Sequence, residues 1–294
     1  MTALGPRPRR SSAPPPADAD EPPPADGQAR KRDPQTASLL IVVAYARNVT
    51  SATDLAAFRD SLYQAYASQH AGRGGGEATA LIYRRDIRPS LAGPAAGPVL
   101  DIGAGQGELV KLLLADGYDA RGVDVSPEQV AIAHAAGLDR VRNGDYRDML
   151  AELPGQLAVV TATDLLEHFT KDEVLDAFHR VARALAPGGI FIARVPNAVS
   201  PLGGHIRYGD FTHETWYTAR SVRQLAAAAG FSPVVIKPCP PVVHGLVSAA
   251  RAVVWKLVSA LFKVALAAET GQLRGHVVTQ NLTFAARKPA MGRQ

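Results

Sequence analysis

The chain has 294 residues, of which 47% are hydrophobic, so it is long enough to bury a full core as one large domain or two small ones. Its formal net charge of +5 points at first sight to nucleic acid or an anionic membrane, but much of the excess lies near the N-terminus, in Arg7, Arg9, Arg10, Arg30, Lys31 and Arg32. We interpret this as a basic tail and expect no nucleic-acid partner. Cys239 is the single cysteine, which excludes an intrachain disulfide framework and a cysteine-rich metal site and favours a cytoplasmic location.

The N-terminal segment, residues 1–48, is predicted to be a disordered tail rich in proline and arginine. Proline runs such as Pro14-Pro15-Pro16 stand among polar residues, and few apolar side chains are available to offset the entropy of ordering. Recognisable globular patterning begins only near Val49. One hypothesis is therefore that residues 1–48 are an upstream extension of the reading frame, and an intact mass that includes Met1 would reject it.

Residues 49–95 are expected to be helical. Apolar side chains recur at helical spacing through Leu55, Phe58, Leu62 and Tyr66. Three glycines at residues 74–76 form a joint. A second helix, from about residue 77 to residue 88, then leads to a connector rich in proline and glycine.

The stretch from Pro98 to Gly107 reads as a buried strand, a tight glycine turn and the start of a helix. This is the first unit of an open α/β sheet, in which ligands bind beyond the carboxyl ends of the strands. A dinucleotide fingerprint spaces its glycines G-x-G-x-x-G to seat a pyrophosphate. Here the spacing is G-x-G-x-G, and it follows Asp101, whose carboxylate would repel a phosphate and attract an amine.

The next apolar segment, residues 120–125, ends at Asp124, which is well placed to accept hydrogen bonds from two ribose hydroxyls. A ligand with an amine and a ribose but no phosphate fits S-adenosylmethionine. After Asp124, Ser126 and Pro127 predict the start of a helix that ends near Gly137. A third strand and its turn are expected at residues 141–146.

At this point the sequence resembles the class I S-adenosylmethionine-dependent methyltransferases, over roughly residues 63–288. The resemblance implies an α/β fold with a Rossmann-like, doubly wound, mostly parallel seven-stranded sheet whose last strand is antiparallel. It implies a helical N-terminal lid over residues 49–95 and a methyltransferase domain over residues 96–294. It also implies S-adenosylmethionine as cofactor, bound by Asp101, Gly103, Gly105, Gly107, Asp124, Val125, Asp145, Tyr146 and Asp164.

The fourth strand is expected at residues 158–164 and is followed by Leu165-Leu166-Glu167-His168-Phe169. In the family this strand lies beside the first, so its tip faces the transferable methyl group and makes Asp164, Glu167 and His168 candidates for chemistry. A structural role for Glu167, tying the loop together, is an equally good interpretation. The tip lacks the Asn-Pro-Pro-Tyr/Phe sequence of enzymes that methylate exocyclic amines of nucleobases, which argues against a nucleic-acid substrate.

A helix at residues 171–186 and a strand at residues 190–195 precede an unusually polar loop, residues 200–214. We interpret this loop as the substrate-binding and catalytic loop, because a plain connector would be short and would carry few titratable groups. His213 is the preferred general base and His168 the second candidate, with Asp164 also assigned to the catalytic group. No convincing metal site is predicted, although Glu167, His168 and Asp210 could converge. The candidate acceptor-binding residues are Tyr66, His70, Asn197, His205, Arg207, Tyr208 and Asp210.

Residues 240–270 are predicted to form an inserted apolar helix, with polar side chains on one arc of residues 242–268. Such a helix could lie on an anionic membrane surface, or it could pack on the domain or on a second subunit. Packing is preferred because Trp255 falls inside the polar arc. Before it, a helix near residues 218–230 and a strand at residues 231–237 are expected, and after it a last edge strand at residues 277–288 completes the sheet.

The predicted activity is O-methylation with S-adenosylmethionine, most simply of a sugar or of a glycan-pathway intermediate. The Asp164–His168 motif resembles ubiquinone-biosynthesis methyltransferases, whereas the loop around Asp210-Phe211-Thr212-His213-Glu214 resembles methyltransferases of polysaccharide assembly. A quinone, polyphenol or other small-molecule acceptor is the alternative. From other classes, a nicotinamide-dependent oxidoreductase and an inactive adaptor of the same fold stay open. The sequence gives neither the methylated atom nor the oligomeric state.

Overall fold

The fold is that of a computed structural model, which describes residues 58–59, 62–63, 76–91 and 97–290. Its centre is a seven-stranded sheet in the order β3-β2-β1-β4-β5-β7-β6. Strands β1 to β5 run parallel, and β7 is antiparallel to both of its neighbours. This confirms the Rossmann-like topology that the sequence predicts. The strands are β1 (Val99–Ile102), β2 (Ala120–Asp124), β3 (Val141–Asn143), β4 (Leu157–Thr163), β5 (Leu185–Pro196), β6 (Val234–Pro238) and β7 (Asn281–Arg287).

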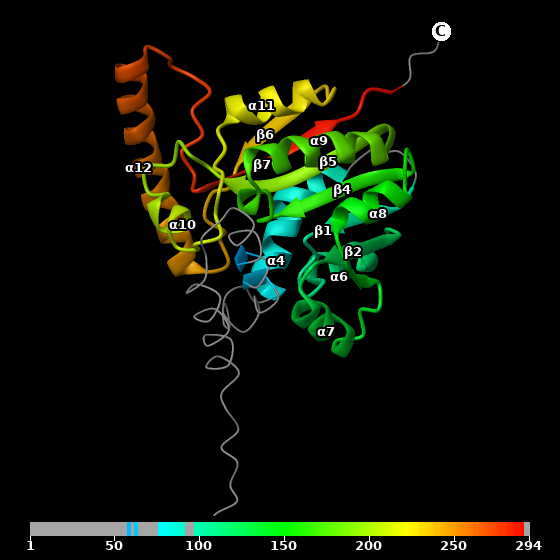
Figure 1. The fold of residues 1–294 in the computed structure, drawn as a ribbon. Helices are drawn as coiled ribbons and strands as arrows, with labels where there is room; N and C mark the ends of the chain where they lie inside the picture. The colour runs from blue at the N-terminus through cyan, green and yellow to red at the C-terminus, as the bar shows by residue number, and fades with distance from the viewer. Residues whose placement is uncertain (1–57, 60–61, 64–75, 92–96, 291–294) are drawn as a thin grey trace, which may run out of the picture. The chain divides into compact units, whose positions relative to one another are not determined.

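Helices cover both faces of the sheet (Figure 1). On one face lie α8 (Tyr146–Glu152), α9 (Lys171–Ala184) and α11 (Ala219–Ala228). The other face carries α6 (Glu108–Ala115), α7 (Pro127–Ala135) and a continuous helical run of α4 (Gly76–Ile82), the π-helix η1 (Tyr83–Ile87) and α5 (Arg88–Leu91). The remaining helices are η2 (Leu166–His168), α10 (Gly204–Arg207) and α12 (Leu246–Thr270).

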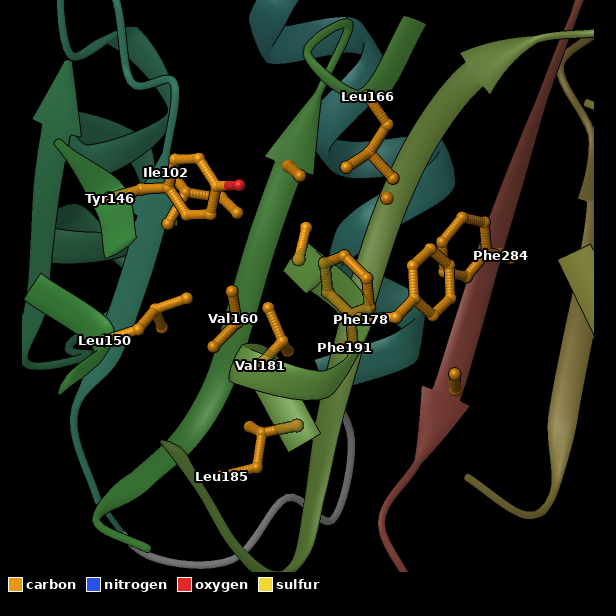
Figure 2. Packing of buried hydrophobic residues seen from close by; sticks show 14 of the residues in the cluster. Ile102, Tyr146, Leu150, Val160, Leu166, Phe178, Val181, Leu185, Phe191 and Phe284 are labelled. Atoms are coloured by element: carbon orange, nitrogen blue, oxygen red, sulfur yellow. The ribbon is translucent and has the colours of Figure 1, made fainter. Parts of the chain in front are cut away.

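The central strands are apolar because both of their faces are covered. All four residues of β1 and six of the seven residues of β4 are buried. On the α9 side, three phenylalanines from α9, β5 and β7 meet in the core, with the ring centroids of Phe178 and Phe191 5.3 Å apart and those of Phe191 and Phe284 5.4 Å apart (Figure 2). Edge-to-face pairs of this kind add to the stabilisation from area burial. This packing fixes the positions of the strands, and therefore of their carboxyl ends.

Several boundaries differ from the sequence prediction. Helix α9 ends at Ala184 instead of residue 186, because Leu185 already pairs with Leu157 and the chain enters β5 before its glycines. Helix α8 was not predicted. Strands β6 and β7 begin at Val234 and Asn281, later than expected, and the two strands pair with each other. The predicted tail and most of the predicted lid lie outside the described residues.

Candidate active site

The glycine turn after β1 has the geometry that its sequence predicts. Gly103, Gly105 and Gly107 all have positive φ, between 52° and 76°, a conformation that residues with a Cβ adopt at a cost. A Cβ on Gly105 would meet the side chain of Gln129 only at an ordinary van der Waals distance of 3.9 Å, so the backbone here is not crowded by its neighbours. A ligand can therefore approach the main chain at this point of the turn.

Asp124, at the end of β2, holds this turn in place. Its two carboxylate oxygens accept hydrogen bonds from the backbone N–H groups of Gly105 and Ser126, both at 2.8 Å. Each oxygen keeps a second lone pair, so the carboxylate is still able to accept from a ribose hydroxyl. Burial raises the pKa of Asp124, and the two backbone hydrogen bonds counteract that rise. Its predicted contact with the ribose stays a prediction.

Asp101 is the buried carboxylate of the site, with 3% of its surface exposed. Thr161 on β4 donates a hydrogen bond to it at 2.7 Å, and in the described part of the chain no Lys, Arg or His lies within ion-pair distance of it. Burial therefore raises the pKa of Asp101 to about 7, with a smaller contribution from Asp124. A buried carboxylate without a protein cation is a fitting partner for the ammonium group of a ligand.

The adenosine end of the predicted site lies beyond β2 and β3. Val125 is 50% exposed, so an apolar side chain is available there to pack on a base. Asp145 caps α8, accepting a hydrogen bond from the backbone N–H of Arg147 at 2.8 Å, and Tyr146 stacks on Phe169 with centroids 5.3 Å apart. The local role of Asp145 is thus helix capping. Its contact with an adenine amine stays a prediction.

Asp164 stands at the tip of β4 with a φ of +52°, the only non-glycine residue with positive φ among those described. Asp tolerates this conformation better than most residues. Its carboxylate pairs with Arg194 on the neighbouring strand β5, a residue that the sequence prediction missed. The pairing of β4 with β5 was predictable, but which side chains of those strands meet was not.

Two histidines meet beside this tip, as the sequence predicts. The rings of His168, from η2, and His213, from the polar loop, lie edge to face with centroids 4.8 Å apart. His168 is buried and His213 is half-buried. Tyr63, from the N-terminal helical segment, packs its ring against His168 at 5.9 Å. One end of the sheet thus gathers side chains from three separate segments of the chain.

The hydrogen bonds of these histidines define which ring nitrogen carries the hydrogen when each imidazole is neutral. Nδ1 of His213 lies 2.9 Å from the carbonyl oxygen of Ile206, which can only accept, so Nδ1 carries the hydrogen. Thr212 donates its single hydroxyl proton to Asp210 at 2.7 Å, so Nδ1 of His168, 2.7 Å from the same hydroxyl, must be a donor too. When neutral, both imidazoles therefore present a basic Nε2. Thr212, which fixes one of them, was missed by the sequence prediction.

Glu167 completes this cluster as a fully buried carboxyl group. Burial, and next to it the negative charge of Asp164, raise the pKa of Glu167 well above its usual value. Glu167, His168 and His213 each offer a ligand atom within 4.8 Å of the others, so these three could hold a metal ion. The sequence placed Asp210 in such a group; in the structure Asp210 reaches His168 through Thr212, and His213 takes its place.

The remaining predicted acceptor residues divide into two sets. His205, Arg207 and Tyr208 lie exposed on or next to α10, with the Arg207 guanidinium 4.2 Å from the ring centroid of Trp216. Asn197 is buried, and its amide donates to the carbonyl oxygens of Val277 and Thr279 while its oxygen accepts from Val199. We therefore assign Asn197 to tying β5 to the segment before β7 instead of to the acceptor. Two further predicted residues, Tyr66 and His70, lie outside the described residues.

The order and directions of the strands are those of a fold found in S-adenosylmethionine-dependent methyltransferases. A sequence profile described as a methyltransferase domain matches residues 79–235, which is more than half of the chain. The chain therefore belongs to this methyltransferase-domain family.

Curated relatives and solved structures agree with this class. A ubiquinone biosynthesis O-methyltransferase of Pseudomonas aeruginosa is 35% identical over 111 residues, covering 35% of this chain and 47% of that protein. A protein of the same name from Xanthomonas oryzae is 34% identical over 100 residues, covering 32% of this chain and 41% of its own. The chain thus spans about half the length of the curated relatives it matches.

Among solved structures, a SAM-dependent methyltransferase from Archaeoglobus fulgidus superposes with a TM-score of 0.58 at 20% identity. The match covers 76% of this chain and 98% of that one. An S-adenosylmethionine-dependent methyltransferase from Mesorhizobium loti gives a TM-score of 0.50 at 17% identity, covering 73% of this chain and 99% of that one. At these identities the likeness concerns the fold.

Proposed function

We propose that the protein transfers a methyl group from S-adenosylmethionine to a hydroxyl oxygen. The observation that carries this proposal is the buried Asp101 carboxylate, which has no cationic partner among the described residues and lies at the tip of β1 beside a glycine turn with positive φ angles. A bound amino-acid ammonium group would supply the missing positive charge. When bound, the cofactor supplies the methyl group, with its sulfonium sulfur as the leaving group.

In this proposal, His213 removes the proton of the acceptor hydroxyl. Its Nε2 is unprotonated in the neutral ring, and its half-buried position keeps it reachable from solvent. His213 would take the hydroxyl proton as the acceptor oxygen gains the methyl group, and the electron pair of the broken carbon–sulfur bond would stay on the sulfur of the bound cofactor. The products are a methyl ether, S-adenosylhomocysteine and a proton.

His168 is assigned a supporting position behind His213. It is buried, its Nδ1–H is held by Thr212, and Thr212 is in turn held by Asp210. These two hydrogen bonds fix the ring plane of His168, which lies edge to face with the ring of His213. In this proposal Thr212 and Asp210 are positioning residues that act through His168.

For the acceptor we propose a sugar or glycan intermediate, with a quinone or polyphenol as the second candidate. The exposed polar groups of the loop around α10 favour the first, because His205, Arg207 and Tyr208 offer hydrogen-bond and stacking partners suited to a hydroxylated ring. The second is favoured by the similarity to curated relatives that are named ubiquinone biosynthesis O-methyltransferases.

One experiment tests cofactor and acceptor together. The purified full chain is incubated with methyl-labelled S-adenosylmethionine and a cell extract fractionated into glycans, lipids and small molecules. We expect label in the glycan fraction, bound as an ether that resists mild base. Label in a quinone fraction would replace the acceptor, and calorimetric binding of a nicotinamide dinucleotide in place of S-adenosylmethionine would overturn the proposal.

A further inference from the structure

Helix α12 presents two different faces. The face toward the domain carries Ser248, Trp255, Ser259 and Phe262 at spacings of three, four and seven residues, and all of them are at least partly buried. The opposite face is a row of exposed aliphatic side chains, in which Leu246 is 91%, Leu257 69% and Leu261 69% exposed. In Figure 1 the helix stands at the margin of the fold. One side of the helix thus packs toward the domain, whereas the aliphatic row and the cations of the predicted polar arc, Arg251, Lys256 and Lys263, are exposed.

This row, which we call the apolar stripe, is continuous along the helix. Its members recur at helical spacing and are Leu246, Val247, Val254, Leu257, Leu261 and Val264, all more than half exposed. Scattered exposed aliphatic residues are normal on a protein, whereas a contiguous stripe marks an interaction surface. Among the described residues, no helix combines the length and the apolar character that crossing a membrane requires.

The charged side chains of α12 before Glu269 are all cationic. Arg251, Lys256 and Lys263 lie on α12 beside the stripe and are exposed, and the helix carries no carboxylate before Glu269. In the part of the chain that the structure describes, no carboxylate lies within ion-pair distance of these three cations. A cavity of about 440 Å³ behind α12 adds Arg223 and His276 to Lys256 and Lys263, with no acidic residue in its lining.

These features select among the possible occupants of the stripe. Two copies of the chain pairing through α12 would bring cations against cations with no carboxylate on the helix to neutralise them before Glu269. An anionic bilayer surface complements both features, because its acyl region takes the aliphatic side chains and its phosphates take the lysines and arginine. We propose that α12 docks the protein on an anionic phospholipid surface, with the apolar stripe at the acyl boundary and Arg251, Lys256 and Lys263 at the headgroups. This docking does not depend on the methyl-transfer proposal.

The test is vesicle flotation with the full chain, using phosphatidylcholine vesicles with and without phosphatidylglycerol. We expect binding to the anionic vesicles, weak binding to the neutral ones, and a decrease on adding salt. The double variant Leu257→Glu/Leu261→Glu should abolish flotation. Reversing both charges in Lys256→Glu/Lys263→Glu should weaken it by about tenfold or more, given the attraction of each lysine to an anionic surface.

Matched controls place equal changes elsewhere. Ile132→Glu/Leu175→Glu alters two exposed apolar residues on α7 and α9, and Lys111→Glu/Lys171→Glu reverses two exposed lysines on α6 and α9. Both controls should float like the unmodified protein, and circular dichroism should show all four variants folded. Equal flotation of the Leu257→Glu/Leu261→Glu variant would overturn the proposal. So would absence of binding to anionic vesicles, or a dimer that dissociates on the leucine changes and does not float.

Discussion

The two ends of the site are held by different means. At the cofactor end, the glycine turn is fixed by backbone conformation and by one carboxylate that ties Gly105 to the end of β2. At the acceptor end, η2 and the polar loop are held mainly through side chains, as in the chain from Asp210 through Thr212 to His168. In our proposal the first arrangement positions the methyl donor and the second positions the acceptor. Changes at one end should therefore affect cofactor affinity, and changes at the other should affect turnover.

The largest effect is expected from His213→Ala. Loss of a general base costs about a hundredfold to ten-thousandfold in rate. Transfer from labelled S-adenosylmethionine should fall by such a factor, while the dissociation constant of the cofactor, measured by calorimetry, should hardly change. An equal loss of affinity and turnover would contradict the division between the two ends.

Next in size is Asp101→Asn at the cofactor end. It keeps the shape of the side chain and removes the charge that would pair with the ligand ammonium. A charge-assisted hydrogen bond contributes about 1.5–3 kcal/mol, so the affinity for S-adenosylmethionine should fall by about tenfold to a hundredfold. Turnover at saturating cofactor should be nearly preserved. An unchanged dissociation constant would remove Asp101 from the binding site.

A dependence on pH follows from the same carboxylate. Because the pKa of Asp101 in the ligand-free protein is raised to about 7, the group is largely protonated below that pH, and a cationic ligand must displace the proton. Affinity should therefore rise by roughly tenfold between about pH 6 and about pH 8, with proton release detectable by calorimetry in buffers of different ionisation enthalpy.

The stability of the ligand-free protein should change in the opposite direction. Its folded state holds the Asp101 proton more tightly than the unfolded chain does, so this contribution to stability is full below about pH 4 and is lost as pH rises through about 7. Asp101→Asn should abolish the pH dependence of cofactor affinity. If affinity still depends on pH in that variant, another group is responsible for the dependence.

A smaller effect is expected from Thr212→Val at the acceptor end. The valine leaves the Nδ1–H of His168 without its hydroxyl partner in a buried place, and such a loss costs about 1–3 kcal/mol. We expect turnover to fall by about tenfold with a shifted pH profile, while Thr212→Ser retains both. A greater loss in Thr212→Val than in His213→Ala would indicate that His168 is the base.

The smallest effect is expected from chelators. If His213 acts as a general base, turnover should survive dialysis against EDTA. A loss of activity that a divalent cation restores would contradict the base assignment and make Glu167, His168 and His213 cation ligands. Glu167→Gln distinguishes the two cases, because only a cation site requires the charged carboxylate.

The sequence by itself determined the glycine turn after β1, and its resemblance to a known family implied the topology of the sheet. Glycines, a carboxylate at a strand tip and an apolar strand are local features of residues 98–107, whereas Asp124 and Thr161 from other strands complete the contacts of the turn and of Asp101. Element boundaries were less certain where pairing decides them, as at Leu185, which joins β5 because Leu157 lies opposite.

Only the tertiary structure decided which side chains meet at the acceptor end. Thr212 and His168 are 44 residues apart in sequence and belong to no common local motif, so nothing in either segment predicts that contact. The same holds for Arg194 on β5, which forms an ion pair with Asp164 at the end of the neighbouring strand β4. It also holds for α12, because the domain determines which side of this helix is covered and which is exposed. Long-range packing sets these partners, because it alone determines which distant segments share a surface.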